Sequence, residues 1–103
     1  MKPITLTNEN FLKVFKIKST SVRAGVKFYS VGKTFIKNVD TQEVIECTVT
    51  KIELMKMSDL DHRHAIDDGF HSLGELLREL DKHYGAIKFD DYVTVITFAE
   101  GDF

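Results

Sequence analysis

Six consecutive residues, Lys18-Ser19-Thr20-Ser21-Val22-Arg23, determine how this chain is interpreted. They follow a segment with helical periodicity, and their Ser, Thr and Val content favours a β-strand. Successive side chains of a strand alternate in direction, so Ser19, Ser21 and Arg23 are expected to share one face. An amine beside hydroxyls is either an activated nucleophile or an ordinary polar strand edge, and the residues alone leave both open.

The size and composition of the chain indicate one soluble domain. It has 103 residues, of which 43% are hydrophobic and 29% charged, so we expect a single domain over residues 1–103 with one core. No apolar run approaches the roughly 18 residues that cross a membrane, and the N-terminal residues lack the apolar segment of a signal peptide. The single Cys47 excludes an internal disulfide. These features predict a cytoplasmic protein with no membrane partner and no cofactor.

The first half of the chain shows the periodicities of a strand, a helix and a hairpin. We expect a strand over Pro3–Leu6, a helix over Asn8–Ile17, a strand over Ser19–Ala24, and a hairpin of Thr34–Lys37 with Glu43–Met55. The long second arm changes the parity of its apolar residues after Val49. Such a change indicates either a bulge that bends the strand or a strand buried on both faces, and both stay open.

The second half of the chain predicts two helices and a closing strand. A short helix over Asp59–Asp67 is expected to end at Gly69, and Ser72 with Glu75 forms a capping box for a helix that stops at Gly85. The last strand, Tyr92–Phe98, is apolar on both parities. Mostly antiparallel strands with helices set to one side predict an α+β fold or a small barrel.

Four segments, in order, resemble the ASCH domain family, which has a PUA-like fold. Lys18–Arg23 resembles its Lys-x-x-Thr-x-Arg strand, and Val31–Lys33 resembles its turn into the next strand. Residues 59–76, with the acidic turn Asp67-Asp68-Gly69-Phe70, resemble its two helices, and Tyr92–Phe98 resembles its closing strand. The resemblance implies a mostly antiparallel PUA-like β-barrel with flanking helices, and a cleft between them that recognises RNA or a modified nucleoside.

One small bacterial branch of the ASCH family hydrolyses N4-acetylcytidine to cytidine and acetate with a Lys, a Thr and a Glu. Carried over to this chain, these become Lys18, Ser21 and Asp68. Ser keeps the hydroxyl, and Asp keeps the carboxylate with one methylene less. The resemblance therefore implies Ser21 as nucleophile, Lys18 as base, and Asp68 as proton relay or orienting group. Without the resemblance, Lys18 is an exposed cation at a helix end, and Ser21 and Asp68 are ordinary polar residues.

A second hypothesis is an RNA-binding ASCH domain without catalysis. Arg23, Lys27, Tyr29 and Lys33 are its candidate ligand-binding residues, because cations contact phosphates while aromatic rings stack on bases. The net charge of −2 gives no global attraction to nucleic acid, so such a partner needs a local basic face. A scattered set of solvated side chains is the competing interpretation.

A third hypothesis is a metal site among the His and Asp residues of 61–71. His64 and Asp68 are four positions apart and can share a helix face, but the His spacing matches no known zinc motif. We therefore predict no metal site.

Overall fold

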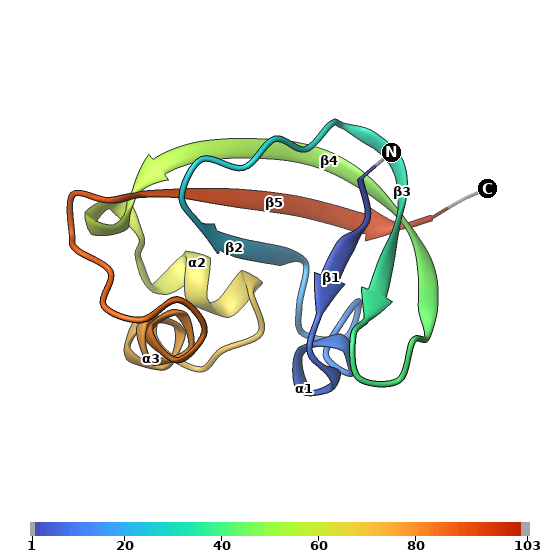
Figure 1. The fold of residues 1–103 in the computed structure, drawn as a ribbon, viewed down its shortest axis with the longest axis horizontal. Coiled ribbons are helices and arrows are strands. Elements are labelled where there is room, and N and C mark those ends of the chain that lie inside the picture. The colour runs from blue at the N-terminus through green and yellow to red at the C-terminus, as the bar shows by residue number, and fades with distance from the viewer. Residues whose placement is uncertain (1, 102–103) are drawn as a thin grey trace.

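A five-stranded sheet forms the frame of the protein in the computed structural model, which describes residues 2–101 (Figure 1). The elements follow in the order β1 (Ile4–Leu6), α1 (Asn8–Phe11), β2 (Thr20–Ala24), β3 (Gly32–Asn38), β4 (Val44–Lys56), the 3-10 helix η1 (Met57–Asp59), α2 (His62–Asp67), α3 (Leu73–Tyr84) and β5 (Tyr92–Glu100). The sheet order is β1-β3-β4-β5-β2, with β1 parallel to β3 and the other neighbours antiparallel. The predicted α+β class is confirmed.

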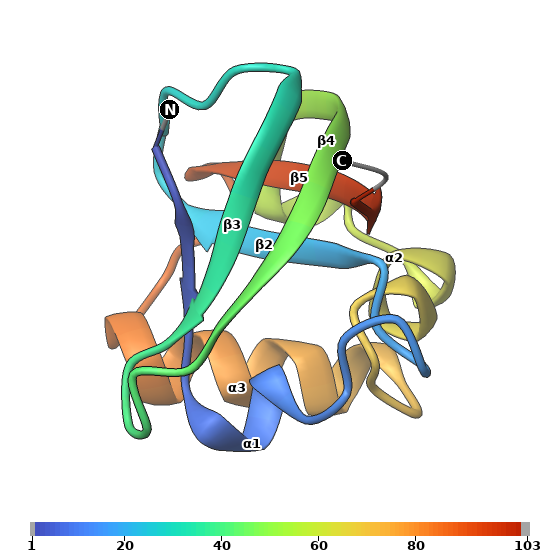
Figure 2. The same ribbon diagram turned by 90° about the vertical axis from the view of Figure 1, so that its right-hand side faces the viewer.

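A β-bulge in β4 curls the sheet. Val49 pairs with Phe98 and Lys51 pairs with Thr97, so Thr50 is the extra residue of the bulge. Of the two explanations for the parity change in the sequence, the bulge is therefore confirmed, and the strand buried on both faces is wrong. Figure 2 shows β3 and β4 crossing steeply over β5 and β2, which is the shape of a half-barrel.

The half-barrel has its two edges at β1 and β2. Arg23 on β2 reaches across, and its Nη2 donates a 2.6 Å hydrogen bond to the carbonyl oxygen of Thr5 on β1. A side chain therefore links the two edge strands where a closed barrel would have backbone pairing. β1 has only three residues, all paired with β3, so it contributes a short edge.

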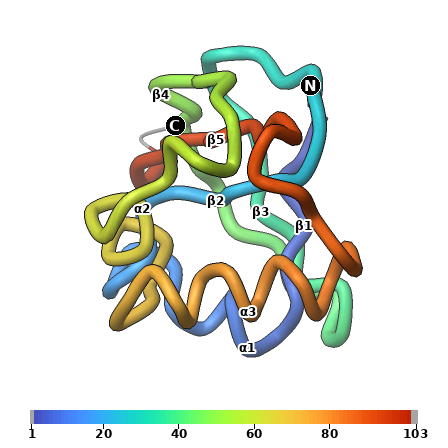
Figure 3. The backbone as a smooth tube through the Cα atoms, turned by 90° about the vertical axis from the view of Figure 1, so that its left-hand side faces the viewer, coloured from blue at the N-terminus to red at the C-terminus, as the bar shows by residue number. Residues whose placement is uncertain are grey.

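Residues 2–101 of the protein form two hydrophobic cores. The first fills the curl of the sheet and includes Ile4, Phe11, Ile36, Val49, Ile96 and Phe98. The second packs α2 and α3 against the sheet and includes Val22, Leu60, Ala65, Leu76, Leu80 and Val93. Figure 3 shows β2 lying between β5 and α3, as the other views also do. The edge strand β2 is thus held between its neighbour β5 and helix α3.

The helix predicted over residues 8–17 is wrong in its second half, because α1 ends at Phe11. Phe15 has φ +64°, in the left-handed region that a right-handed helix cannot contain. The chain then forms a tight turn, in which the backbone amides of residues 16, 17 and 18 all donate to Lys13 O. Thr7 occupies the N-cap position as expected, but its hydroxyl accepts from the Asn10 side chain.

The helix predicted over residues 59–67 divides into η1 and α2, because Leu60 has an extended backbone with ψ 138°. Asp61 is the N-cap of α2, and its carboxylate accepts from the His64 amide. Helix α3 follows the prediction, with the Ser72 hydroxyl accepting from the Glu75 amide. The Glu75 carboxylate contacts His71 instead of closing the predicted capping box. In residues 2–101, no helix has the length and apolar character that a membrane crossing requires.

Candidate functional site

The turn between α1 and β2 delivers Lys18 to the interior. Isolated β-bridges pair Lys18 with Val14 and with Asp68. Lys18 is only 3% exposed, so the expectation of a solvated cation at a helix end is wrong. The turn replaces the last part of the predicted helix, and it is what brings this lysine against the end of α2.

Gly69 makes this approach of the two chain segments possible. Its φ of +87° lies in the left-handed region, and a Cβ at this position would come within 3.3 Å of Lys18 Cβ and Lys13 Cδ. A residue with a side chain would be strained there and would push on the lysine. The acidic turn therefore requires a glycine at position 69, both for its backbone conformation and for the close approach of Lys18.

Lys18 and Asp68 form a buried ion pair. Lys18 Nζ contacts Asp68 Oδ1 and also donates to the Asp68 carbonyl oxygen at 3.3 Å. The other carboxylate oxygen, Oδ2, accepts from the Val22 amide of β2 at 3.4 Å. Both side chains are almost fully enclosed, at 3% and 5% exposed. Asp68 is thus held by a backbone amide of β2 while it faces the lysine.

Burial shifts the titration of both partners toward their neutral forms. Loss of hydration lowers the pKa of Lys18, although the facing Asp68 charge acts in the opposite direction. Loss of hydration likewise raises the pKa of Asp68, with the Lys18 charge opposing it. Both shifts act against two separate charges on this buried pair.

Ser21 and Arg23 lie on the same face of β2, as their spacing predicts. Arg23 Nε donates to Ser21 Oγ at 2.8 Å while Arg23 Nη2 holds Thr5 O. Ser21 is 3% exposed. The Ser21 hydroxyl accepts from a cation, so its own proton points elsewhere and is available for donation.

A third group of polar residues comes from α1 and α3. Asn10 Nδ2 donates to Thr7 Oγ1 at 3.1 Å and to Glu79 Oε2 at 3.0 Å. The same Glu79 oxygen contacts His83 Nε2 at 2.9 Å. Burial opposes ionisation of Glu79, but the hydrogen bonds from Asn10 and His83 outweigh it and keep the pKa of this carboxyl below its usual range.

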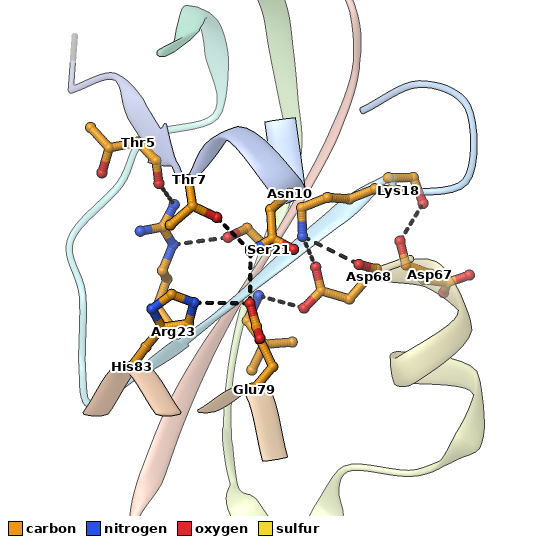
Figure 4. A network of polar contacts seen from close by, with 12 residues as sticks. Thr5, Thr7, Asn10, Lys18, Ser21, Arg23, Asp67, Asp68, Glu79 and His83 are labelled. Atoms are coloured by element: carbon orange, nitrogen blue, oxygen red, sulfur yellow. Dashed lines mark hydrogen bonds and ion pairs between the residues drawn. The ribbon is translucent and has the colours of Figure 1, made fainter. Parts of the chain in front are cut away.

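These three groups line one cavity of about 280 Å³. Its wall includes Asn10, Lys18, Ser21, Arg23, Asp68, Glu79 and His83. Figure 4 shows Lys18 and Asp68 on one side of the network, Arg23 and His83 on the other, and Glu79 between them. The cavity is therefore a mixed-charge pocket between half-barrel and helices, in which an amine, a hydroxyl and carboxylates face a common space.

The other predicted binding residues lie outside this cavity. Lys27 is exposed on the loop after β2, and its amide donates to Thr94 Oγ1. Tyr29 packs against the first core with Lys2 Nζ 4.4 Å from its ring centre. Lys33 is exposed on β3. Of the four predicted ligand-binding residues, the structure brings only Arg23 together with the catalytic candidates.

The His and Asp residues of 61–71 have separate partners, and Asp68 faces Lys18. His64 contacts Asp61, and His71 contacts Glu75. Within residues 2–101, no group of three or more His, Cys, Asp or Glu side chains is arranged to hold a metal ion.

Sequence reasoning missed Asn10, Glu79 and His83 as pocket residues. Glu79 and His83 are four positions apart on the helix predicted to stop at Gly85, and this spacing is a usable signal for the pair. The contact of Asn10 with Glu79 joins residues 69 positions apart, and no local pattern encodes it.

Comparison with known proteins identifies the fold. The sequence matches no family model and no curated protein. An ASCH domain from Lactobacillus crispatus JV V101 has a TM-score of 0.64 and 16% identity, covering 86% of this chain and 67% of that one. Protein EF3133 from Enterococcus faecalis V583, of the family DUF984, has a TM-score of 0.69 and 15% identity, covering 99% and 77%. At these identities the likeness shows the fold, and it confirms the predicted ASCH-type, PUA-like architecture.

Proposed function

We propose that this protein is an ASCH domain that recognises a modified nucleoside or RNA base in its cavity and hydrolyses an N4-acyl amide on a cytidine. The observation that carries the proposal is the buried Lys18–Asp68 pair, which lines the same cavity as the Ser21 hydroxyl. The cavity volume of about 280 Å³ lies just below the range of about 300–1,000 Å³ for pockets of drug-sized ligands. It suits one nucleoside better than a longer oligonucleotide.

The first step requires an uncharged Lys18. Burial lowers the pKa of this amine, and Asp68 can hold the shared proton because burial raises the pKa of its carboxyl. Ser21 Oγ then attacks the acyl carbonyl carbon, and its proton passes to Lys18. The Arg23 Nε–H that already points at Ser21 Oγ offsets the negative charge that develops as the proton leaves.

The second step breaks the amide bond. The tetrahedral intermediate collapses, the bond between the acyl carbon and N4 breaks, and the Lys18 ammonium gives its proton to the departing amine of cytidine. Water, deprotonated by Lys18, then attacks the acyl-Ser21 ester. The bond between the acyl carbon and Ser21 Oγ breaks, Oγ takes the proton back from Lys18, and acetic acid leaves as acetate and a proton. No oxidant or further reactant is needed, because each proton taken up by Lys18 is returned to a leaving group.

The test is incubation with N4-acetylcytidine, with cytidine and acetate measured by chromatography. Wild-type protein is expected to release both in equal amounts, and the variant Lys18→Met, of similar length but without the amine, is expected to release neither above the rate in buffer. Lys51→Met is a matched control, since Lys51 is an exposed lysine on β4 outside the cavity. Equal rates for wild type and Lys18→Met would refute the hydrolytic role.

RNA binding without chemistry is the second candidate function, favoured by one surface feature. Phe28 is 84% exposed beside Lys27 on the loop between β2 and β3. An exposed ring next to a cation is a stacking platform for an unpaired base. Binding of single-stranded RNA is then expected to weaken with added salt and to fall in Phe28→Ala. Absence of RNA binding at low salt would remove this candidate, and equal binding by Phe28→Ala and wild type would exclude Phe28 as the stacking platform.

A further inference from the structure

Asn10, Glu79 and His83 form one wall of the cavity, which we call the acceptor wall because oxygen acceptors predominate in it. Both donor contacts of the Asn10 amide nitrogen are taken, by Thr7 and Glu79, which turns the amide oxygen away from them. Within residues 2–101, Asn10 Oδ1 is one of two buried side-chain polar atoms without a hydrogen-bond partner, and Asn10 is 7% exposed. Buried acceptors are nearly always paired, so this atom indicates a donor that a ligand would bring.

Glu79 adds a charged acceptor beside it. Its side chain is 16% exposed, its lowered pKa keeps it ionised, and an ionised carboxylate only accepts hydrogen bonds. The contacts from Asn10 and His83 both reach Oε2, and together they fix the carboxylate on the cavity wall. A ligand matched to this wall must therefore carry at least two donors close together.

We propose that this wall binds the vicinal 2′- and 3′-hydroxyls of a ribose, and so makes the site selective for ribonucleosides over 2′-deoxyribonucleosides. The inference rests on the proposed function, which puts the acyl group at Ser21. Exposure of side chains rises from 3% at Lys18 to 34% at His83, so the cavity opens toward α3. With the acyl amide at the enclosed end, the base follows and the sugar lies at the open end, against Glu79 (Figure 4).

Matched pairs of nucleosides test the selectivity. We would measure kcat/KM for N4-acetylcytidine and its 2′-deoxy analogue, and calorimetric affinity for cytidine and 2′-deoxycytidine. Wild-type protein is expected to favour the ribonucleoside about tenfold or more in at least one of the two measurements, the usual effect of one hydrogen bond to a charged acceptor. A ratio of ribonucleoside to 2′-deoxyribonucleoside near one in both measurements overturns the inference. This test uses wild-type protein alone, so it does not depend on the folding of a variant.

Two substitutions on the same helix then locate the selectivity. Glu79→Gln is expected to reduce the ratio to near one, because it removes the charge with little change of shape. Glu75→Gln is the control, since Glu75 forms the equivalent pair with His71, four residues apart at 3.2 Å, but does not line the cavity. A ratio unchanged in Glu79→Gln overturns the assignment and leaves the Asn10–Glu79–His83 network as a tie between α1 and α3.

The failure of the proposed function gives a different result. If wild-type protein neither binds nor turns over any of the four nucleosides, the function and the ribose site are both overturned. If it acts on both sugars equally, only the ribose site is overturned.

Discussion

Replacing Asp68 with Asn should lower the free energy of unfolding by about 3–5 kcal/mol at pH 7, because it leaves Lys18 buried without its counter-charge. The size follows from the burial of both side chains, at 3% and 5% exposed. The variant can respond by deprotonating Lys18. From an ordinary pKa of 10.5, neutralising the amine at pH 7 costs about 5 kcal/mol at most, at about 1.4 kcal/mol per pKa unit. Loss of this amount is a large fraction of the stability of a domain of this size.

The pH dependence of this loss identifies its origin. The folded wild-type pair holds one proton near neutral pH, whichever group carries it. The unfolded chain also holds one, on the lysine. The pair therefore changes the free energy of unfolding little with pH in this range. In Asp68→Asn the lowered pKa of Lys18 means that the folded state binds fewer protons than the unfolded state. The stability of the variant therefore rises with pH toward the ordinary lysine pKa of 10.5.

Urea denaturation followed by circular dichroism, at about pH 7 and about pH 9.5, measures both effects. The double variant Lys18→Met/Asp68→Leu is the control, since replacing a buried pair by apolar residues is often neutral or stabilising. A loss in Asp68→Asn below about 1 kcal/mol, the range of an exposed pair, would refute the reasoning. A double variant no more stable than Asp68→Asn would refute it equally.

Three further predictions concern Arg23, Gly69 and Cys47. Arg23→Gln removes a charge-assisted hydrogen bond to Ser21 and the link to β1, so kcat/KM for N4-acetylcytidine should fall about tenfold or more; an unchanged kcat/KM would show that Arg23 only bridges the strands. Gly69→Ala should lower the free energy of unfolding by at least about 1–2 kcal/mol because of its φ of +87°, and a thermal melt equal to wild type would contradict this. Burial raises the pKa of Cys47 to about 11, so its thiol should resist alkylation at pH 8 until urea unfolds the chain, as mass spectrometry can record; rapid labelling of folded protein would be inconsistent with its burial.

Local patterns predicted the parts of the fold that depend on neighbours in sequence. Alternation along β2 placed Ser21 and Arg23 on one face, and the two are joined by a hydrogen bond. The parity change after Val49 left a bulge and a strand buried on both faces as alternatives, and the structure has the bulge, which reverses which side chains face the core. Helix α3 followed from the serine at its N-terminus and the glycine at its end.

The errors arose where tertiary contacts override local periodicity. Phe11, Leu12 and Phe15 have helical spacing, yet the chain turns at Phe15 with φ +64° and pairs Lys18 with Asp68, 50 positions away. Hydrogen bonds within the turn, from the amides of residues 16, 17 and 18 to Lys13 O and from Phe15 N to Lys18 O, replace those of the lost helical turns, and the Phe15 ring packs against Phe98. The resemblance to the ASCH family grouped Lys18 with Asp68, which spacing alone could not do. No local sequence pattern indicated that Asn10 of α1 would meet Glu79 and His83 of α3.

The most direct test of the hydrolytic account is to look for the acyl group on Ser21 itself. Acid quenching during turnover of N4-acetylcytidine, followed by peptide mass spectrometry, should find one acetyl group on the peptide carrying Ser21, and none in Ser21→Ala. Cytidine release by Ser21→Ala at the wild-type rate, with no acetyl group on wild-type Ser21, would contradict the proposal that the buried Lys18–Asp68 pair activates this serine.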